Sequence, residues 1–120
     1  MDTKLADKTV FITGAGAGIG QSIAKHFAVE KSNIYVTDIS AVAAEQTAKE
    51  IRDAGGRATA MALDVTKRAD VFAAVGKVVE ATGGIDVLVN NAGVVALAKI
   101  EEITEAEFDR IYAVNVKGKL

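Results

Sequence analysis

The chain has 120 residues, of which half are hydrophobic and a quarter are charged, with a formal charge of −2 at pH 7. This composition is typical of one globular domain and excludes a disordered chain. The small negative charge provides no basic footprint for nucleic acid or an anionic membrane. The absence of cysteine excludes a disulfide framework, a thiolate metal site and a cysteine nucleophile.

The first eight residues hold four charged side chains and no apolar run, which is unlike a signal peptide. No apolar stretch approaches the roughly 18 residues that a membrane span requires. His26 is the single histidine, so no metal cluster is expected. The expectation is a cytoplasmic protein with no metal and with neither nucleic acid nor a membrane as partner.

Four short β-prone runs alternate with longer helical patterns. The runs span residues 9–13, 33–38, 59–64 and 85–90, and each is nearly continuous in apolar character. Continuous apolar strands are typical of parallel sheets that are covered on both faces. The intervening segments are long enough for crossover helices, so the pattern predicts one α/β domain with the order β-α-β-α-β-α-β.

Capping residues mark the expected helix ends. Ser40 and Gly55 bracket the helix after the second strand, since serine caps an N-terminus and glycine ends a helix in the left-handed conformation. Thr66 and Gly83 bracket the next helix in the same way. Thr104 opens a capping box for a last helix that runs to the C-terminus.

Residues 13–20 read Thr-Gly-Ala-Gly-Ala-Gly-Ile-Gly, between the first strand and an amphipathic helix. Because glycine lacks a Cβ atom, the chain can turn tightly here and its backbone can approach a phosphate closely. The exposed N–H groups and the dipole of the following helix favour an anion at this place. The turn therefore predicts a site for the pyrophosphate of a dinucleotide, and a flexible glycine loop is the alternative.

Four motifs follow one another at characteristic intervals. The general dinucleotide fingerprint G-x-G-x-x-G does not fit the glycine turn, whereas T-G-x-x-x-G-x-G does, with Gly14, Gly18 and Gly20 as its fixed points. The further motifs are Asp64-Val65, Asn90-Asn91-Ala92-Gly93 and the Asn-Val-Lys-Gly that begins at Asn115. Together they resemble the short-chain dehydrogenase/reductase family over residues 8 to 120.

The resemblance implies a Rossmann-type, doubly wound parallel sheet with the partial strand order 3-2-1-4, in one domain (1–120) that is cut within the helix after the fourth strand. It implies that Asp64 and Val65 contact adenine, and that Asn115 holds a water in a proton relay as the one catalytic residue of the family present here. The cofactor-binding residues it implies are Gly14, Gly16, Gly18, Ile19, Gly20, Asp38, Asp64, Val65, Asn90, Ala92 and Gly93.

Asp38 closes the second strand, about twenty residues after the glycine turn. A carboxylate at this position accepts both hydroxyls of the adenosine ribose and repels a 2′-phosphate, so it favours NAD over NADP. Family members that use NADP place a basic residue where this chain has Ala17 or Ile39. The sequence therefore predicts NAD as the cofactor; a solvated turn acid is the alternative interpretation of Asp38.

The family's reaction needs a tyrosine, a lysine four residues later that lowers the pKa of the phenol, and a serine that polarises the substrate oxygen. The two tyrosines, Tyr35 and Tyr112, are followed four places later by Ile39 and Val116. We therefore expect the NAD-binding portion of an oxidoreductase, inactive by itself. Its substrate, a small alcohol or carbonyl compound, would be transformed by hydride transfer only in a full-length form.

Two other functions stay open on the sequence: a non-catalytic nucleotide-binding or assembly module with the same fold, and a less favoured S-adenosylmethionine-dependent transferase. We also expect the run at 85–90 to form an open apolar sheet edge, because the strands beyond it are missing. Pairing of two such edges about a two-fold axis would produce a homo-oligomer.

Overall fold

The computed structural model describes residues 4–91 and 95–97 of the chain. A five-stranded sheet has the order β3-β2-β1-β4-β5, in which the first four strands run parallel and β5 is antiparallel to β4. The strands are β1 (Thr9–Ile12), β2 (Asn33–Asp38), β3 (Arg57–Ala62), β4 (Val87–Val89) and β5 (Val95–Leu97), and the helices are α1 (Gly18–Val29), α2 (Ala41–Asp53) and α3 (Arg68–Thr82). The predicted α/β class and the order 3-2-1-4 are confirmed.

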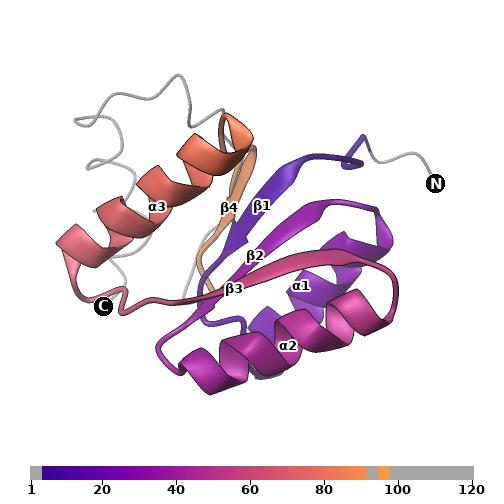
Figure 1. Cartoon of the computed structure of the whole chain (residues 1–120), viewed down its shortest axis with the longest axis horizontal. Coiled ribbons are helices and arrows are strands. Elements are labelled where there is room, and N and C mark those ends of the chain that lie inside the picture. The colour runs from indigo at the N-terminus through magenta and orange to yellow at the C-terminus, as the bar shows by residue number, and fades with distance from the viewer. Residues whose placement is uncertain (1–3, 92–94, 98–120) are drawn as a thin grey trace.

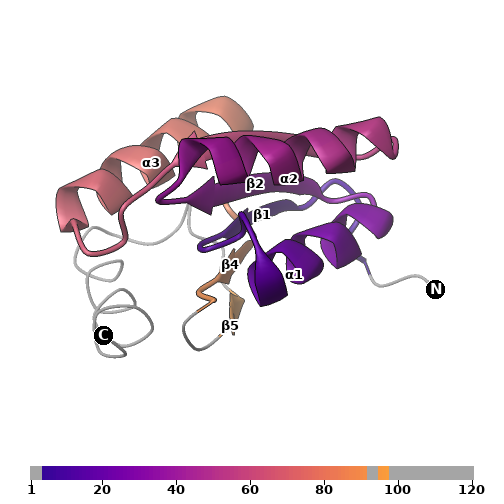
Figure 2. The same ribbon diagram turned by 90° about the horizontal axis from the view of Figure 1, so that it is seen from below.

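Helices cover both faces of the sheet, with α1 and α2 on one side and α3 on the other (Figures 1 and 2). Along β1, Val10 and Ile12 pack in the core beneath α1 and α2, whereas Phe11 packs in the core beneath α3. Successive side chains of a strand point to opposite faces, so a strand with two cores must be apolar throughout. This is why the strands are recognisable as continuous apolar runs.

The predicted capping residues occur at both ends of α2 and at the C-terminal end of α3. The Ser40 hydroxyl oxygen accepts the Ala43 N–H at 3.1 Å, and Gly55 follows α2 with a φ of +93°. Gly83 ends α3 with a φ of +89°. The prediction that Thr66 caps α3 is wrong, because its hydroxyl donates to the Asp64 carboxylate at 2.6 Å and Lys67 occupies the N-cap position instead. The helix expected from Thr104 lies outside the described residues.

The outer edge of β4 is not open. Val95–Leu97 pairs with it as an antiparallel strand, in the register Val87↔Leu97. The expected open edge at 85–90, and the edge-to-edge pairing of two copies that rested on it, are therefore wrong. The physical reason is that antiparallel strands need only a short connection, so the apolar residues soon after Asn91 can return along β4. Homo-oligomerisation by another surface stays a prediction.

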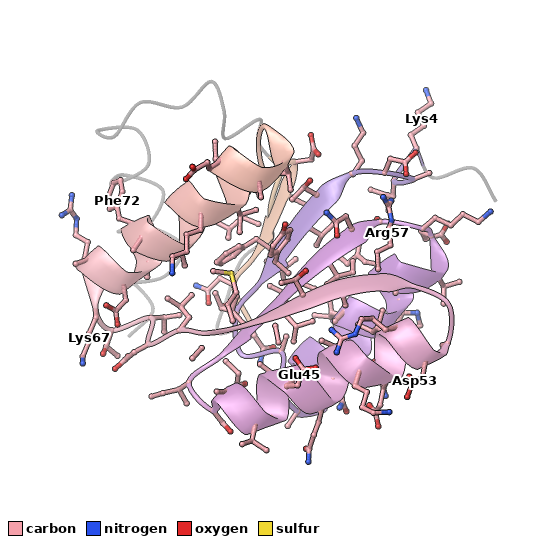
Figure 3. The ribbon with its side chains drawn as sticks, in the orientation of Figure 1. Lys4, Glu45, Asp53, Arg57, Lys67 and Phe72 are labelled. Atoms are coloured by element: carbon pink, nitrogen blue, oxygen red, sulfur yellow. The ribbon has the colours of Figure 1, made fainter. Side chains whose placement is uncertain are left out.

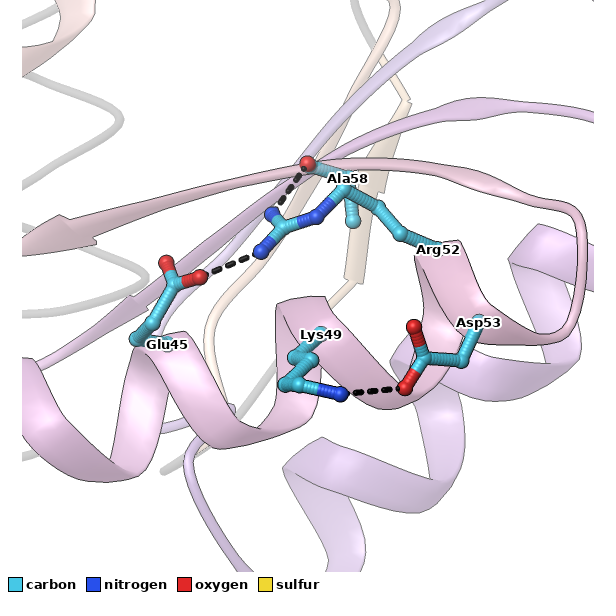
Figure 4. A network of polar contacts seen from close by, with 5 residues as sticks. All are labelled: Glu45, Lys49, Arg52, Asp53 and Ala58. Carbon is cyan, nitrogen blue, oxygen red and sulfur yellow. Dashed lines mark hydrogen bonds and ion pairs between the residues drawn. The ribbon is translucent and has the colours of Figure 1, made fainter.

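At the other end of the sheet, polar side chains lie over the backbone of β3. Arg52 donates to the Ala58 carbonyl at 2.9 Å and forms an ion pair with Glu45 (Figure 4). A charged side chain at an outermost strand opposes pairing with other chains. Arg57, labelled in Figure 3, donates to the Asp7 carboxylate at 2.7 Å and to the Lys31 carbonyl at 2.9 Å. These contacts tie together the amino-terminal ends of the strands, away from the glycine turn.

Candidate dinucleotide site

The glycine turn of residues 13–20 leaves β1 between the carboxyl ends of β2 and β4. The chain passes from β1 through α1 to β2 on one side, whereas β4 pairs with β1 on the other side. Strand order therefore reverses at β1, and ligands of open α/β sheets bind in the crevice at such a switch point.

Backbone hydrogen bonds from both neighbouring strands hold the turn. The Thr13 N–H donates to the Val89 carbonyl at 3.0 Å, and the Ala15 N–H donates to the Thr37 carbonyl at 2.9 Å. The side-chain amide of Asn91 donates to the Gly14 carbonyl at 3.3 Å. The turn is thus built into the sheet, which argues against the alternative of a flexible loop.

Two of its glycines have a backbone conformation that other residues rarely adopt. Gly14 and Gly18 have φ angles of +62° and +60°. A Cβ atom on Gly18 would meet no atom within 4 Å, so this backbone borders open space. A bound group can therefore approach the chain closely at Gly18.

The other two glycines are needed for packing. A Cβ atom on Gly20 would lie 2.2 Å from the Gly14 carbonyl oxygen, so only glycine allows α1 to begin against the turn. A Cβ atom on Gly16 would lie 2.6 Å from the Ala43 Cβ and 2.9 Å from the Asp38 carboxylate. Gly16 thus gives α2 and Asp38 the room to approach the turn.

The start of α1 offers donors to an anion. Ala17 occupies the N-cap position, and its side chain has no oxygen with which to cap the first N–H groups. These groups and the positive end of the helix dipole face the glycine turn. The side chain of Ile19 in this first turn is 73% exposed. The arrangement suits a phosphate or pyrophosphate group.

Asp38 lies at the end of β2, with its carboxylate between two backbone donors. One oxygen accepts the Gly16 N–H at 2.9 Å and the other accepts the Ser40 N–H at 3.0 Å. A carboxylate has about four acceptor positions, so each oxygen can also accept a ligand hydroxyl. The next residue, Ile39, is 74% exposed and brings no positive charge to this carboxylate.

Asp64 follows β3, on the next strand of the sheet beyond β2. The Leu63 N–H donates to the Asp38 carbonyl at 2.8 Å, which brings the ends of the two strands together. The Thr66 hydroxyl and then the Thr66 N–H lower the pKa of the Asp64 carboxyl below its ordinary 3.8 by stabilising the charged form, and Lys67 lowers it further. Asp64 is therefore an ionised acceptor at neutral pH. Val65 is half-buried against the core beneath α3.

The end of β4 completes the described part of the site. Asn90 is buried there, whereas Ala92, Gly93 and Asn115 lie outside the described residues. Asn91, which the sequence analysis left out of the site residues, holds the Gly14 carbonyl. The second asparagine of the Asn-Asn pair was the signal for this role.

Several expectations outside the site can be compared with the described residues. His26 is exposed on α1, and the described residues hold no group of three or more side chains that could bind a metal ion. Within the same residues, no helix is long and apolar enough to cross a membrane. Cytoplasmic location stays a prediction. Lys67, labelled in Figure 3, is exposed just before α3.

Known proteins are similar to this chain in sequence and in fold. A family model described as short chain dehydrogenase matches residues 8–120. A sorbitol dehydrogenase from Cereibacter sphaeroides is 43% identical over 117 residues, which cover 98% of this chain and 44% of that protein. A galactitol 2-dehydrogenase from Agrobacterium fabrum is 41% identical, with coverage of 98% and 44%.

Among solved structures, the hydroxysteroid dehydrogenase from Escherichia coli matches with a TM-score of 0.73 and 40% identity, over 94% of this chain and 48% of that one. The NAD-bound structure of a proposed D-mannonate oxidoreductase from Haemophilus influenza has a TM-score of 0.69 and 34% identity, over 75% and 32% of the two chains. The chain thus spans less than half the length of these relatives.

Proposed function

The chain belongs to the short-chain dehydrogenase family, and on that premise we propose that it binds NAD in the crevice between the glycine turn and Asp38. This family membership excludes the S-adenosylmethionine-dependent transferase that the sequence had left open. The observation that carries the proposal is the Asp38 carboxylate, which accepts the Gly16 N–H at 2.9 Å. This contact supports the proposal because a carboxylate that could accept the ribose hydroxyls lies directly beside a turn suited to a phosphate.

The residues present fit the adenosine and pyrophosphate half of the cofactor. The pyrophosphate would lie against Gly18 and Ile19, where the backbone borders open space and the first N–H groups of α1 have no side-chain cap. Asp38 would accept the two ribose hydroxyls. Asp64, ionised at neutral pH, would accept the amino group of adenine, with Val65 beside the ring.

On the nicotinamide side, the support is the family pattern. Asn90, Ala92 and Gly93 would line the second ribose, and Asn115 would hold a water for a proton relay. When bound, NAD supplies a carbon that accepts hydride. The sequence holds no tyrosine with a lysine four residues later, so we propose that these 120 residues bind the cofactor without turnover. Oxidation of an alcohol, or the reverse reduction of a carbonyl, would belong to a longer form.

The preference for NAD over NADP follows from charge. The 2′-phosphate of NADP would lie next to the Asp38 carboxylate, and like charges at close range repel each other. Ala17 and Ile39 offer no cation to offset this repulsion. We therefore propose that NAD binds at least about tenfold more tightly than NADP, a difference of about 1.4 kcal/mol.

Calorimetric titration of the 120-residue chain with each cofactor tests the proposal. The variant Asp38→Ala should weaken NAD binding and reduce the difference between NAD and NADP. The matched control is Asp53→Asn, which removes an exposed carboxylate at the far end of α2 and should leave both affinities unchanged. Equal or tighter binding of NADP by the unmodified chain would contradict the proposed selectivity, and no heat with either cofactor would contradict the proposed function.

A further inference from the structure

On one face of the sheet, α2 contacts first the glycine turn and then α1, along a row of residues that we call the α1–α2 seam. Nearest the site, Gly16 lies so close to Ala43 that a Cβ atom on the glycine would come within 2.6 Å of the Ala43 Cβ. Next, the Gln21 amide donates to the Thr47 hydroxyl oxygen at 3.0 Å and, more weakly, to the exposed Glu50 carboxylate at 3.4 Å. Last, the Lys25 ammonium pairs with the Glu50 carboxylate at 2.9 Å.

At the end of the seam far from the glycine turn, Lys25 and Glu50 hold α1 and α2 together only weakly. The side chains of Lys25 and Glu50 are 46% and 56% exposed, and exposed ion pairs contribute little to stability. Both residues also border a hollow of about 420 Å³ between the ends of the helices, so the helices are not packed together there. The spacing of α2 from the turn and from α1 therefore depends on the contact of Gly16 with Ala43 and on the hydrogen bond from Gln21 to Thr47.

Thr47 is an exception on the buried face of α2. Its neighbours on that face, Ala44, Ala48 and Ile51, are apolar members of the core, whereas Thr47 has a hydroxyl and is 0% exposed. A buried hydroxyl costs free energy unless it forms hydrogen bonds. The Gln21 amide supplies one, and no cofactor contact of the proposed function uses either side chain.

The position of this hydrogen bond links it to Asp38. Thr47 lies one helical turn after Ala43, on the same face of α2. The Asp38 carboxylate receives one N–H from Gly16 on the turn side and one from Ser40 at the start of α2. Its orientation is thus sensitive to the distance between the turn and α2.

We infer that Gln21 and Thr47 are positioning residues, which set the spacing of α1 and α2 and thereby hold the Asp38 carboxylate ready for the ribose. The inference rests on the proposed NAD function for its consequence in binding. In the free protein, loss of the Gln21–Thr47 hydrogen bond should also weaken the hydrogen bond from the Gly16 N–H to the Asp38 carboxylate.

The test compares Thr47→Val, which keeps the shape but removes the hydroxyl, with Thr47→Ser, which keeps the hydroxyl. NAD affinity is measured by calorimetry, and exchange of the Gly16 amide hydrogen is measured by NMR in the free protein. We expect Thr47→Val to weaken NAD binding by about threefold to tenfold, the effect of one neutral hydrogen bond, and to speed Gly16 exchange. Thr47→Ser should leave NAD affinity and the exchange rate of the Gly16 amide close to those of the unmodified chain. The control Lys49→Ala, which breaks an exposed ion pair on α2 (Figure 4), should change neither.

A double-mutant cycle separates positioning from general loss of stability. If Thr47 acts through Asp38, Thr47→Val should cause no further loss of NAD affinity in the Asp38→Ala background. An equal loss in both backgrounds would overturn the inference, as would unchanged affinity and exchange in Thr47→Val. If the unmodified chain fails to bind NAD, the proposed function fails, and Gly16 exchange still decides whether Thr47 positions Asp38.

Discussion

Replacing Gly16 by alanine tests whether packing holds Asp38 against the glycine turn. The new Cβ atom would lie 2.6 Å from the Ala43 Cβ and 2.9 Å from the Asp38 Cγ, whereas ordinary contacts begin at 3.4 Å. The neighbours must therefore retreat by the differences, 0.8 Å and 0.5 Å. Because Ala43 belongs to a packed helix, the Asp38 side chain is the part that can turn away.

The magnitude follows from the hydrogen bond that this movement breaks. The Gly16 N–H donates to the Asp38 carboxylate at 2.9 Å. A hydrogen bond to a charged group contributes about 1.5–3 kcal/mol, so loss of the oriented carboxylate should weaken NAD binding by about tenfold to a hundredfold. Overpacking itself costs about 1–3 kcal/mol, so Tm should fall by about 4 °C or more.

Calorimetry with NAD and thermal unfolding measure the two effects. Adding Ala43→Gly removes the nearer of the two close contacts and should restore part of the NAD affinity. The matched control is Gly76→Ala in α3, where a Cβ atom would meet nothing within 4 Å. It should leave NAD affinity unchanged and stabilise the helix by up to about 1 kcal/mol. Unaltered NAD affinity in Gly16→Ala, or no recovery in the double variant, would refute the packing argument.

Three further predictions concern titration and stability. The Asp64 carboxyl should titrate below pH 3.8 in carbon NMR, so that its contribution to stability is present above pH 3.8 and is lost as the pH falls through the lowered pKa. The variant Thr66→Val should raise this titration midpoint, and an unchanged midpoint would contradict Thr66 as the cause of the lowered pKa. Lys31→Gly should raise the free energy of unfolding, measured in urea, by about 0.5–1 kcal/mol, because Lys31 has a φ of 67° that glycine adopts without strain. A free energy of unfolding below that of the unmodified chain would show that no strain is relieved. Arg52→Ala should lower the free energy of unfolding by about 0.5–1.5 kcal/mol and increase light scattering on heating, since the Ala58 carbonyl of the outermost strand loses its donor. If neither the free energy of unfolding nor the light scattering changed, the protective role of Arg52 would be contradicted.

The elements and the glycine turn could be predicted from the sequence because their signals are local. A strand between two cores is apolar throughout, Ser40 caps within its own turn, and Gly83 ends a helix by its own backbone conformation. The same locality explains one error. Thr66 has the chemistry of a cap, but the equally close Asp64 carboxylate accepts its hydroxyl instead.

The site required the tertiary structure because its contacts join distant residues. The Gly16–Asp38 and Gln21–Thr47 hydrogen bonds span 22 and 26 residues, and the bond from Asn91 to the turn spans 77. Gly16 is not a fixed point of the T-G-x-x-x-G-x-G spacing, and only the tertiary structure shows that Ala43 of α2 and Asp38 leave room for nothing but glycine there. The sequence thus determined the four parallel strands, the three described helices and the turn, because these depend on near neighbours. The tertiary structure decided the pairing of the fifth strand and the way Asp38 is held between the turn and α2, because both depend on contacts between separate segments.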